Sequence, residues 1–158
     1  MTARIDSVCR AICENGQWRV SNLQLQKILY LVQMVHMGRN HGKSLFSGAF
    51  EAWDYGPVEP DVYRRVRMFG SGPIQNVFFN ALAFRVDDVR KALIDEVCVD
   101  LLRKKPGELV EITHWEKGAW ATHYEPGTKG IKIPDSDIFK EYTDRIASGK
   151  FRDNNTAA

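Results

Sequence analysis

The chain has few of the features that mark secreted, membrane-spanning or disulfide-rich proteins. It holds three cysteines in 158 residues, an odd number without a Cys-x-x-Cys pair, which argues against a disulfide framework and indicates a reducing compartment. No apolar run approaches the roughly 20 residues that cross a bilayer, and the N-terminus lacks the charged-then-apolar pattern of a signal peptide. We therefore expect a soluble cytoplasmic protein with no membrane partner.

The short motifs of common enzymes are also missing. The sequence contains no Gly-x-Ser-x-Gly elbow, Walker loop, dinucleotide-binding glycine fingerprint or His-Glu-x-x-His zinc motif. A net charge of +2 gives little electrostatic attraction to nucleic acid, although residues 1–50 carry six Lys and Arg against two Asp and Glu. We expect a protein without metal or cofactor, and the composition disfavours nucleic acid as a partner.

Helical periodicity dominates what is present. With 44% hydrophobic residues, the chain can pack one domain. Apolar spacings of three and four predict a helix over residues 5–15 and a long second helix, which starts at a Ser21/Gln24 capping box and breaks at 38–43. The same spacings predict further helices over 61–69, 87–104, 109–114 and 134–146. The pair Cys9 and Cys13 shares a helical face with Ile5 and Ile12, which favours core packing over metal binding.

Extended structure is predicted only between helices. Residues 45–53 read as extended, Gly56-Pro57 as a sharp corner, and Pro60 as the first turn of a helix. Residues 131–133 form a possible short strand, and 74–85, which have no clean period, a loop or a short strand. The predicted fold is therefore mainly α, a compact single-domain helical bundle with a small extended or β-hairpin element.

Two clusters could carry chemistry or binding. His114 and His123 flank Trp115 and Trp120, but their spacing matches no helical metal pair, and a histidine at a helix C-terminus commonly complements the helix dipole. An enzyme would need His114 to meet a carboxylate such as Glu111 or Glu116 in a pocket. Three arginines of the 61–69 helix, Arg64, Arg65 and Arg67, are either a solvated face or a contact for an acidic partner.

One ordered set of motifs resembles the Panacea-domain proteins. The set comprises 25–33 (Leu-Gln-Lys-Ile-Leu-Tyr-Leu-Val-Gln), 42–46 (Gly-Lys-Ser-Leu-Phe), 51–58 (Glu-Ala-Trp-Asp-Tyr-Gly-Pro-Val), 60–63 (Pro-Asp-Val-Tyr) and Thr113-His114. The resemblance covers about residues 5 to 146. This chain departs from the pattern at Ala119-Trp120, where the family has Pro-Trp. The domain is expected over 1–148, with a flexible tail over 149–158.

The resemblance implies an antitoxin rather than an enzyme. Panacea proteins are known to neutralise a toxin encoded beside them, usually by forming a complex, and they need no known metal or cofactor. Members of the SocA-type branch act as adaptors that deliver the toxin to the ClpXP protease, and related members are often phage-associated. Repression of its own operon by DNA binding is a third possibility, although the chain shows no helix-turn-helix with a basic recognition helix.

The expected roles of individual residues follow from this resemblance and from surface chemistry. Aromatic and Arg side chains concentrate binding energy at interfaces. We expect partner contacts from Trp53, Tyr55, Val58, Arg64, Arg65, Arg67, Trp115 and Trp120. We expect structural motif roles for Leu25, Lys27, Tyr30, Gly56, Pro57, Thr113 and His114. The terminal Ala157 and Ala158 resemble the small-residue tags that ClpX reads, or are an arbitrary frayed end.

Overall fold

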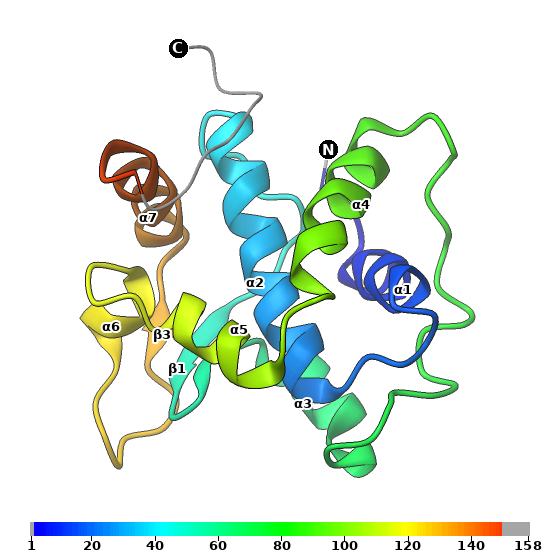
Figure 1. Ribbon diagram of the computed structural model, residues 1–158, viewed down its shortest axis with the longest axis horizontal. Helices are drawn as coiled ribbons and strands as arrows, with labels where there is room; N and C mark the ends of the chain where they lie inside the picture. The colour runs from blue at the N-terminus through cyan, green and yellow to red at the C-terminus, as the bar shows by residue number, and fades with distance from the viewer. Residues whose placement is uncertain (1, 150–158) are drawn as a thin grey trace.

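The long helix α2 (Asn22–Arg39) is the centre of the fold in the computed structural model, which describes residues 2–149. Its N-terminus is the predicted capping box: the Ser21 hydroxyl accepts from the Gln24 backbone N–H at 3.3 Å, and the Gln24 side chain accepts from the Ser21 backbone N–H at 2.9 Å. Figure 1 shows α2 running through the middle of the molecule, and α1, α4, α5 and α7 all contact it. The prediction of a central helix buried on several sides is confirmed.

The other helices follow the predicted periodicity with shifted ends. They are α1 (Ile5–Asn15), α3 (Pro60–Val66) continued by the 3₁₀ turn η1 (Arg67–Phe69), α4 (Val89–Leu101), α5 (Pro106–Thr113), α6 (Ala119–His123) and α7 (Asp135–Ala147). Helix α4 begins later than predicted because Asp88 is its N-cap and accepts from the Arg90 backbone N–H at 2.9 Å. Helix α6 was not predicted, since five residues are too few to show a helical period.

A three-stranded antiparallel sheet fills the predicted extended region. Its strands β1 (Phe50–Trp53), β2 (Gly56–Val58) and β3 (Lys132–Ile133) lie in the order β2-β1-β3, and the predicted short strand at 131–133 is confirmed as β3. The prediction of a corner at Gly56-Pro57 is wrong. The register pairs Trp53 with Gly56 and Ala52 with Pro57, so the turn lies at Asp54-Tyr55, while Gly56-Pro57 belong to β2.

The end of α2 shows why a glycine need not stop a helix. The predicted break over residues 38–43 is confirmed, because the helix ends at Arg39 with Asn40 as its C-cap, and Gly38 itself lies within the last turn. A Cβ on Gly38 would lie 2.2 Å from ring atoms of Tyr142 in α7. The missing side chain therefore allows α7 to pack closely against α2, and this close approach outweighs the weak helical propensity of glycine.

The buried core joins the helices to the sheet. Its large fully buried side chains include Tyr30, Phe46 and Phe50, and Tyr30 meets Phe50 edge to face with ring centroids 5.2 Å apart. The three cysteines are free and buried, as predicted for small hydrophobic side chains. Burial raises the pKa of Cys13 and of Cys98 to about 12, so neither is a reactive thiolate.

The stretch between η1 and α4 contains no helix or named strand over residues 70–88, which settles the predicted choice in favour of a loop. Ile74 and Phe78 anchor it in the core, while Leu82 and Val86 are exposed. The trace runs beside α1 in Figure 1, where the Arg10 side chain donates to the Ala81 carbonyl at 2.6 Å. In the described part of the chain, none of the helices combines the length and the apolar character that a membrane crossing requires.

Candidate partner-binding site

Helix α2 holds the extended segments by buried polar side chains as well as by apolar packing. The Gln26 amide pairs with Glu59 at both ends, accepting from its N–H at 2.8 Å and donating to its C=O at 3.4 Å. Two turns further on, Gln33 accepts from the Leu45 N–H at 2.7 Å and donates to the Phe46 C=O at 3.0 Å. Each amide replaces the water that a buried strand or loop backbone loses, which fixes where these segments lie on α2.

Lys27, Gly56 and Thr113 meet at the junction of α2, β2 and α5. The Lys27 ammonium donates to the Pro57 carbonyl at 3.1 Å, and the side chain is only 1% exposed. Gly56 has φ of +114°, and a Cβ there would lie 2.8 Å from both the Lys27 Cε and the Thr113 Oγ1. Only glycine accommodates both the backbone angle and the close approach. These motif residues thus contribute to the structure of the junction.

His114 closes the same junction by stacking. It is the C-cap of α5, and its ring lies parallel to Trp120 with centroids 3.6 Å apart. Burial lowers the pKa of His114, and the neighbouring Lys27 lowers it further, against a hydrogen bond to the Tyr55 backbone. Neither Glu111 nor Glu116 is among the groups that perturb it. The stacking gives His114 a packing role against Trp120.

A second buried network attaches α7 to the rest of the fold. The Tyr30 hydroxyl donates to Glu141 Oε1 at 2.6 Å, and the same oxygen accepts from the Ala119 N–H at 2.9 Å. The other carboxylate oxygen accepts from the Arg145 guanidinium at 2.7 Å. The same guanidinium lies over the Trp115 ring, with its Cζ 5.0 Å from the ring centroid. Glu141 is 1% exposed, so the carboxylate is stable there because it is fully paired.

A cavity of about 540 Å³ opens beside the Lys27 junction, between the start of α2, the β1–β2 hairpin and α3. Ligand sites of proteins usually fall in this size range. The lining comprises Asn22, Leu23, Gln26, Lys27, Trp53, Asp54, Tyr55, Val58, Tyr63, Gly70, Ser71, Gly127, Thr128 and Lys129. We call it the hairpin cavity. It brings together residues from four separate parts of the sequence.

Three of the expected partner-binding residues line the hairpin cavity. Tyr55 stands at the hairpin turn with 70% of its surface exposed, whereas Val58 is 6% exposed and forms part of the wall. Trp53 is half-buried and packs edge to face on Tyr63, with centroids 4.7 Å apart. The structure therefore places Trp53, Tyr55 and Val58 around one concavity, where only Tyr55 projects freely.

The arginines of α3 and η1 lie apart from the cavity lining, and two of them have internal partners. Arg65 contacts Asp6 of α1 at 2.6 Å and lies over the Phe78 ring, while Arg64 pairs with Asp61 on its own helix. These pairs are exposed, so each contributes little to stability. Arg67 is exposed in η1.

The two remaining tryptophans are used mainly inside the fold. Trp120 is 8% exposed, donates its indole N–H to the Trp53 carbonyl at 2.7 Å, and stacks on Tyr124 as well as on His114. Trp115 is half-buried beneath Arg145. Both therefore present little free surface in this structure. The expected tail residues Ala157 and Ala158 lie outside the described residues.

Sequence reasoning missed Asn22, Tyr63 and Glu141. Asn22 follows the capping serine and Tyr63 ends the Pro60–Tyr63 motif, so their positions were visible, but their convergence on one cavity was not. Glu141 lies beside the apolar residues Ile138 and Tyr142 of α7. A carboxylate within an otherwise apolar helix face is the signal that would have identified it.

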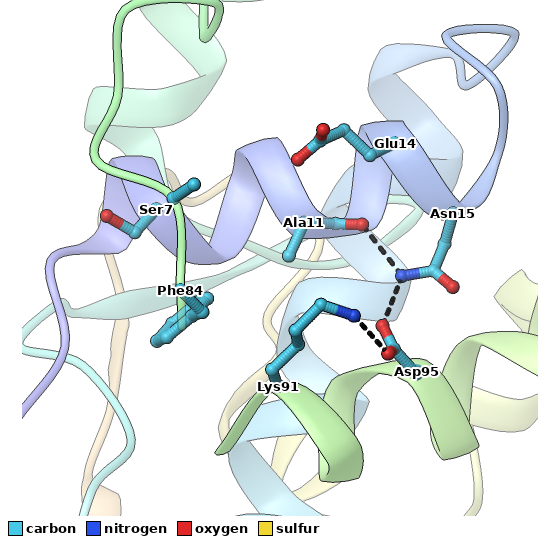
Figure 2. A pocket seen from close by; sticks show the side chains of 8 residues that line it. Ser7, Ala11, Glu14, Asn15, Phe84, Lys91 and Asp95 are labelled. Carbon is cyan, nitrogen blue, oxygen red and sulfur yellow. Dashed lines mark hydrogen bonds and ion pairs between the residues drawn. The ribbon is translucent and has the colours of Figure 1, made fainter. Parts of the chain in front are cut away.

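A second cavity, of about 370 Å³, lies between α1, α4 and the loop at 83–84. Figure 2 shows Asn15, Lys91 and Asp95 turned toward one another: Asn15 donates to the Ala11 carbonyl and to Asp95, both at 2.8 Å, and Lys91 donates to Asp95 at 2.6 Å. The bond from Asn15 to Asp95 joins α1 to α4, and the other two bonds lie within one helix each. We interpret this second cavity as a gap in the packing of α1 against α4, and the hairpin cavity is the better candidate site.

Comparisons with known proteins agree with the motif residues. A model of the "Antitoxin SocA-like, Panacea domain" family matches residues 25–121. A curated relative, "Antitoxin SocA" from Caulobacter vibrioides (strain NA1000 / CB15N), is 33% identical over 135 residues, which cover 75% of this chain and 70% of that protein. No solved structure gives a significant match.

The fold is a mainly helical single domain, and the matches identify its class. The chain belongs to the SocA-like antitoxin family with a Panacea domain. The resemblance drawn from the 25–33, 51–58 and 113–114 motifs is thereby confirmed. Membership supports an antitoxin role with a cognate toxin as partner, and it suggests regulation instead of catalysis.

Proposed function

We propose that this protein neutralises a cognate toxin by binding it directly, with the hairpin cavity and Tyr55 at the centre of the contact. The support is the family match together with one feature of the surface. A large aromatic side chain, 70% exposed at a tight turn, stands beside a cavity of about 540 Å³. Exposed aromatics next to a concavity are the usual anchors of protein interfaces.

The rigid base of this surface supports the same proposal. Two hydrogen bonds hold the hairpin: Lys27 donates to the Pro57 carbonyl, and the Trp120 indole donates to the Trp53 carbonyl. A surface fixed in advance loses less conformational entropy on binding than a mobile one. The Lys27 junction thus serves binding by keeping the hairpin in place.

Neutralisation then follows one of two routes, which share the binding step. In one route the toxin stays in a stable complex. In the other the protein acts as an adaptor and transfers the toxin to the ClpXP protease. Expressing the product of the neighbouring reading frame, with and without this protein, tests neutralisation by either route. We expect growth arrest by the neighbour alone and recovery on co-expression.

The half-life of the toxin decides between the routes. Loss of the toxin within minutes in cells with ClpXP, and its persistence in cells without ClpX, identifies an adaptor. A toxin that persists in both strains and co-purifies with this protein identifies sequestration. A neighbour that is harmless by itself, or that still arrests growth in the presence of this protein, contradicts the proposal.

A further inference from the structure

Helix α6 is too short to keep its place in the fold without support. It has five residues, and isolated helices of fewer than about 12 residues are marginal in water. Its N-cap, Gly118, has no side chain that could accept the first backbone N–H groups of the helix. Figure 1 shows α6 beside β3, and α6 contacts α7, β1 and β3. The position of α6 must therefore be set by these neighbours.

Glu141 of α7 supplies the acceptor that α6 lacks. Its Oε1 accepts from the backbone N–H of Ala119, the first residue of α6, at 2.9 Å. The approach is close, because a Cβ on Gly118 would lie 3.0 Å from the same oxygen. Glu141 is itself held, since Oε1 also accepts from the Tyr30 hydroxyl of α2 and Oε2 accepts from Arg145. A fully paired buried carboxylate thus ties the start of α6 to α2 and α7.

Side chains from both ends of α6 hold the turn of the hairpin. Trp120, the second residue of the helix, donates its indole N–H to the Trp53 carbonyl at 2.7 Å. Tyr124, the C-cap, donates its hydroxyl to the Asp54 carboxylate at 2.6 Å. The next residue of the turn is Tyr55, whose side chain is 70% exposed. Helix α6 therefore fixes the two residues that precede the exposed aromatic side chain.

Glu141 and Trp120 are not part of the lining of the hairpin cavity, which includes the turn residues 53–55. A change at Glu141 thus reaches the cavity indirectly, through α6 and the turn. We propose that Glu141 is a positioning residue for partner binding, because its bond to the Ala119 N–H fixes α6 and α6 fixes the turn. This inference rests on the proposed function for its claim that the turn binds a partner.

The size of the effect on binding depends on how often the turn has the arrangement that the partner recognises. The apparent affinity of a partner falls in proportion to the population of that arrangement in the free protein. If the loss of α6 as a support lowers this population to between about one third and about one tenth, the apparent dissociation constant rises about three- to tenfold. The contacts made in the complex itself need not change.

Two variants remove this support at different points. Trp120→Phe deletes the indole N–H and keeps an aromatic ring in its place. The double variant Glu141→Met with Arg145→Met removes the acceptor for α6 and replaces a buried ion pair by apolar side chains, which folded proteins often tolerate. The control is Tyr30→Phe, because it removes the other hydrogen bond to Glu141 Oε1 and leaves the bond to α6. A backbone NMR spectrum of each variant shows whether it is folded.

Backbone ¹⁵N relaxation of the full-length protein, measured without any partner, reports the order of the turn. The natural protein should give order parameters of about 0.85 at residues 54–56, as a rigid backbone does. Trp120→Phe and the double variant should lower them toward about 0.6, whereas Tyr30→Phe should leave them unchanged. In calorimetric titrations, the purified product of the neighbouring reading frame should bind both variants about three- to tenfold more weakly than the natural protein and Tyr30→Phe.

Order parameters that stay unchanged at the turn in either variant refute the proposal, because α6 would then not hold the turn through these bonds. An equal fall in Tyr30→Phe also refutes it, since a general loss of stability would explain the change. Equal affinities beside a loosened turn refute the role of positioning in binding. A neighbouring product that does not bind the natural protein removes the proposed function, whereas unchanged order parameters beside normal binding remove only the role of Glu141.

Discussion

The buried lysine of the central helix predicts an unusual dependence of stability on pH. Lys27 is 1% exposed, its hydrogen bond goes to the neutral Pro57 carbonyl, and burial lowers its pKa from 10.5 to about 7. In the unfolded chain the same amine keeps a pKa near 10.4. The folded state therefore binds fewer protons than the unfolded state between these two values. Raising the pH through this window must stabilise the fold, because it removes protons from the unfolded state.

The size of the effect follows from the two pKa values. Each pH unit well inside the window contributes about 1.4 kcal/mol, and the contribution is half of this at the folded pKa itself. Between pH 7 and pH 8.5 the Lys27 amine should thus add about 1.5 kcal/mol to the free energy of unfolding. Below pH 7 both states are protonated and the gain is absent.

Urea unfolding at four pH values from 7.0 to 8.5, for the natural protein and for Lys27→Met, measures this gain. The upper limit is set by the buried cysteines, whose raised pKa makes stability fall once the unfolded thiols ionise. The control is Lys91→Met, because the ion pair with Asp95 raises the pKa of Lys91 and leaves it charged in both states over this window. The natural protein should gain about 1.5 kcal/mol relative to Lys27→Met, and parallel curves for the two proteins would refute the burial of a nearly neutral amine.

Two further substitutions test the buried junctions by chemical unfolding. Gly56→Ala should lower the free energy of unfolding by about 2–4 kcal/mol, because its Cβ would lie 2.8 Å from Lys27 Cε and φ is +114°. The control is Gly107→Ala, which has no neighbouring atom within 4 Å and should be neutral or slightly stabilising. Equal effects of the two substitutions would contradict the close approach. Tyr30→Phe should cost about 1–3 kcal/mol with little loss of packing, since it removes the 2.6 Å bond to the buried Glu141; unchanged stability would mean that this bond is not formed.

Local chemistry explains which parts of the fold could be predicted from the sequence. The Ser21/Gln24 capping box and the periodic residues of α1, α2 and α7 are signals within a few residues of one another, and the structure has these elements at the expected places. The strand at 132–133 was also recognised. A turn adjacent to a glycine was misplaced by two residues, because Gly56 serves the contact with α5 and not the corner.

Long-range pairing explains what the sequence could not provide. The resemblance predicted a structural role for Lys27 without its contacts. The partners of Gln26 and Lys27 lie 33 and 30 residues away, so their burial depends on the tertiary structure. The same holds for Trp120, which seemed an interface residue until the Trp53 carbonyl and the His114 ring were found against it. The candidate site was therefore predicted in part, through Trp53, Tyr55 and Val58 of the hairpin, while the contributions of Asn22 and Tyr63 were not predicted.

The central claim is that the surface around Tyr55 holds the toxin, and a dissociation constant tests it most directly. We would measure binding of the purified toxin to the natural protein, to Tyr55→Ser and to Val99→Ser, two substitutions at exposed positions. The account predicts that Tyr55→Ser weakens binding at least about tenfold, or about 1.4 kcal/mol, with no change for Val99→Ser. Equal affinities for all three proteins would contradict it.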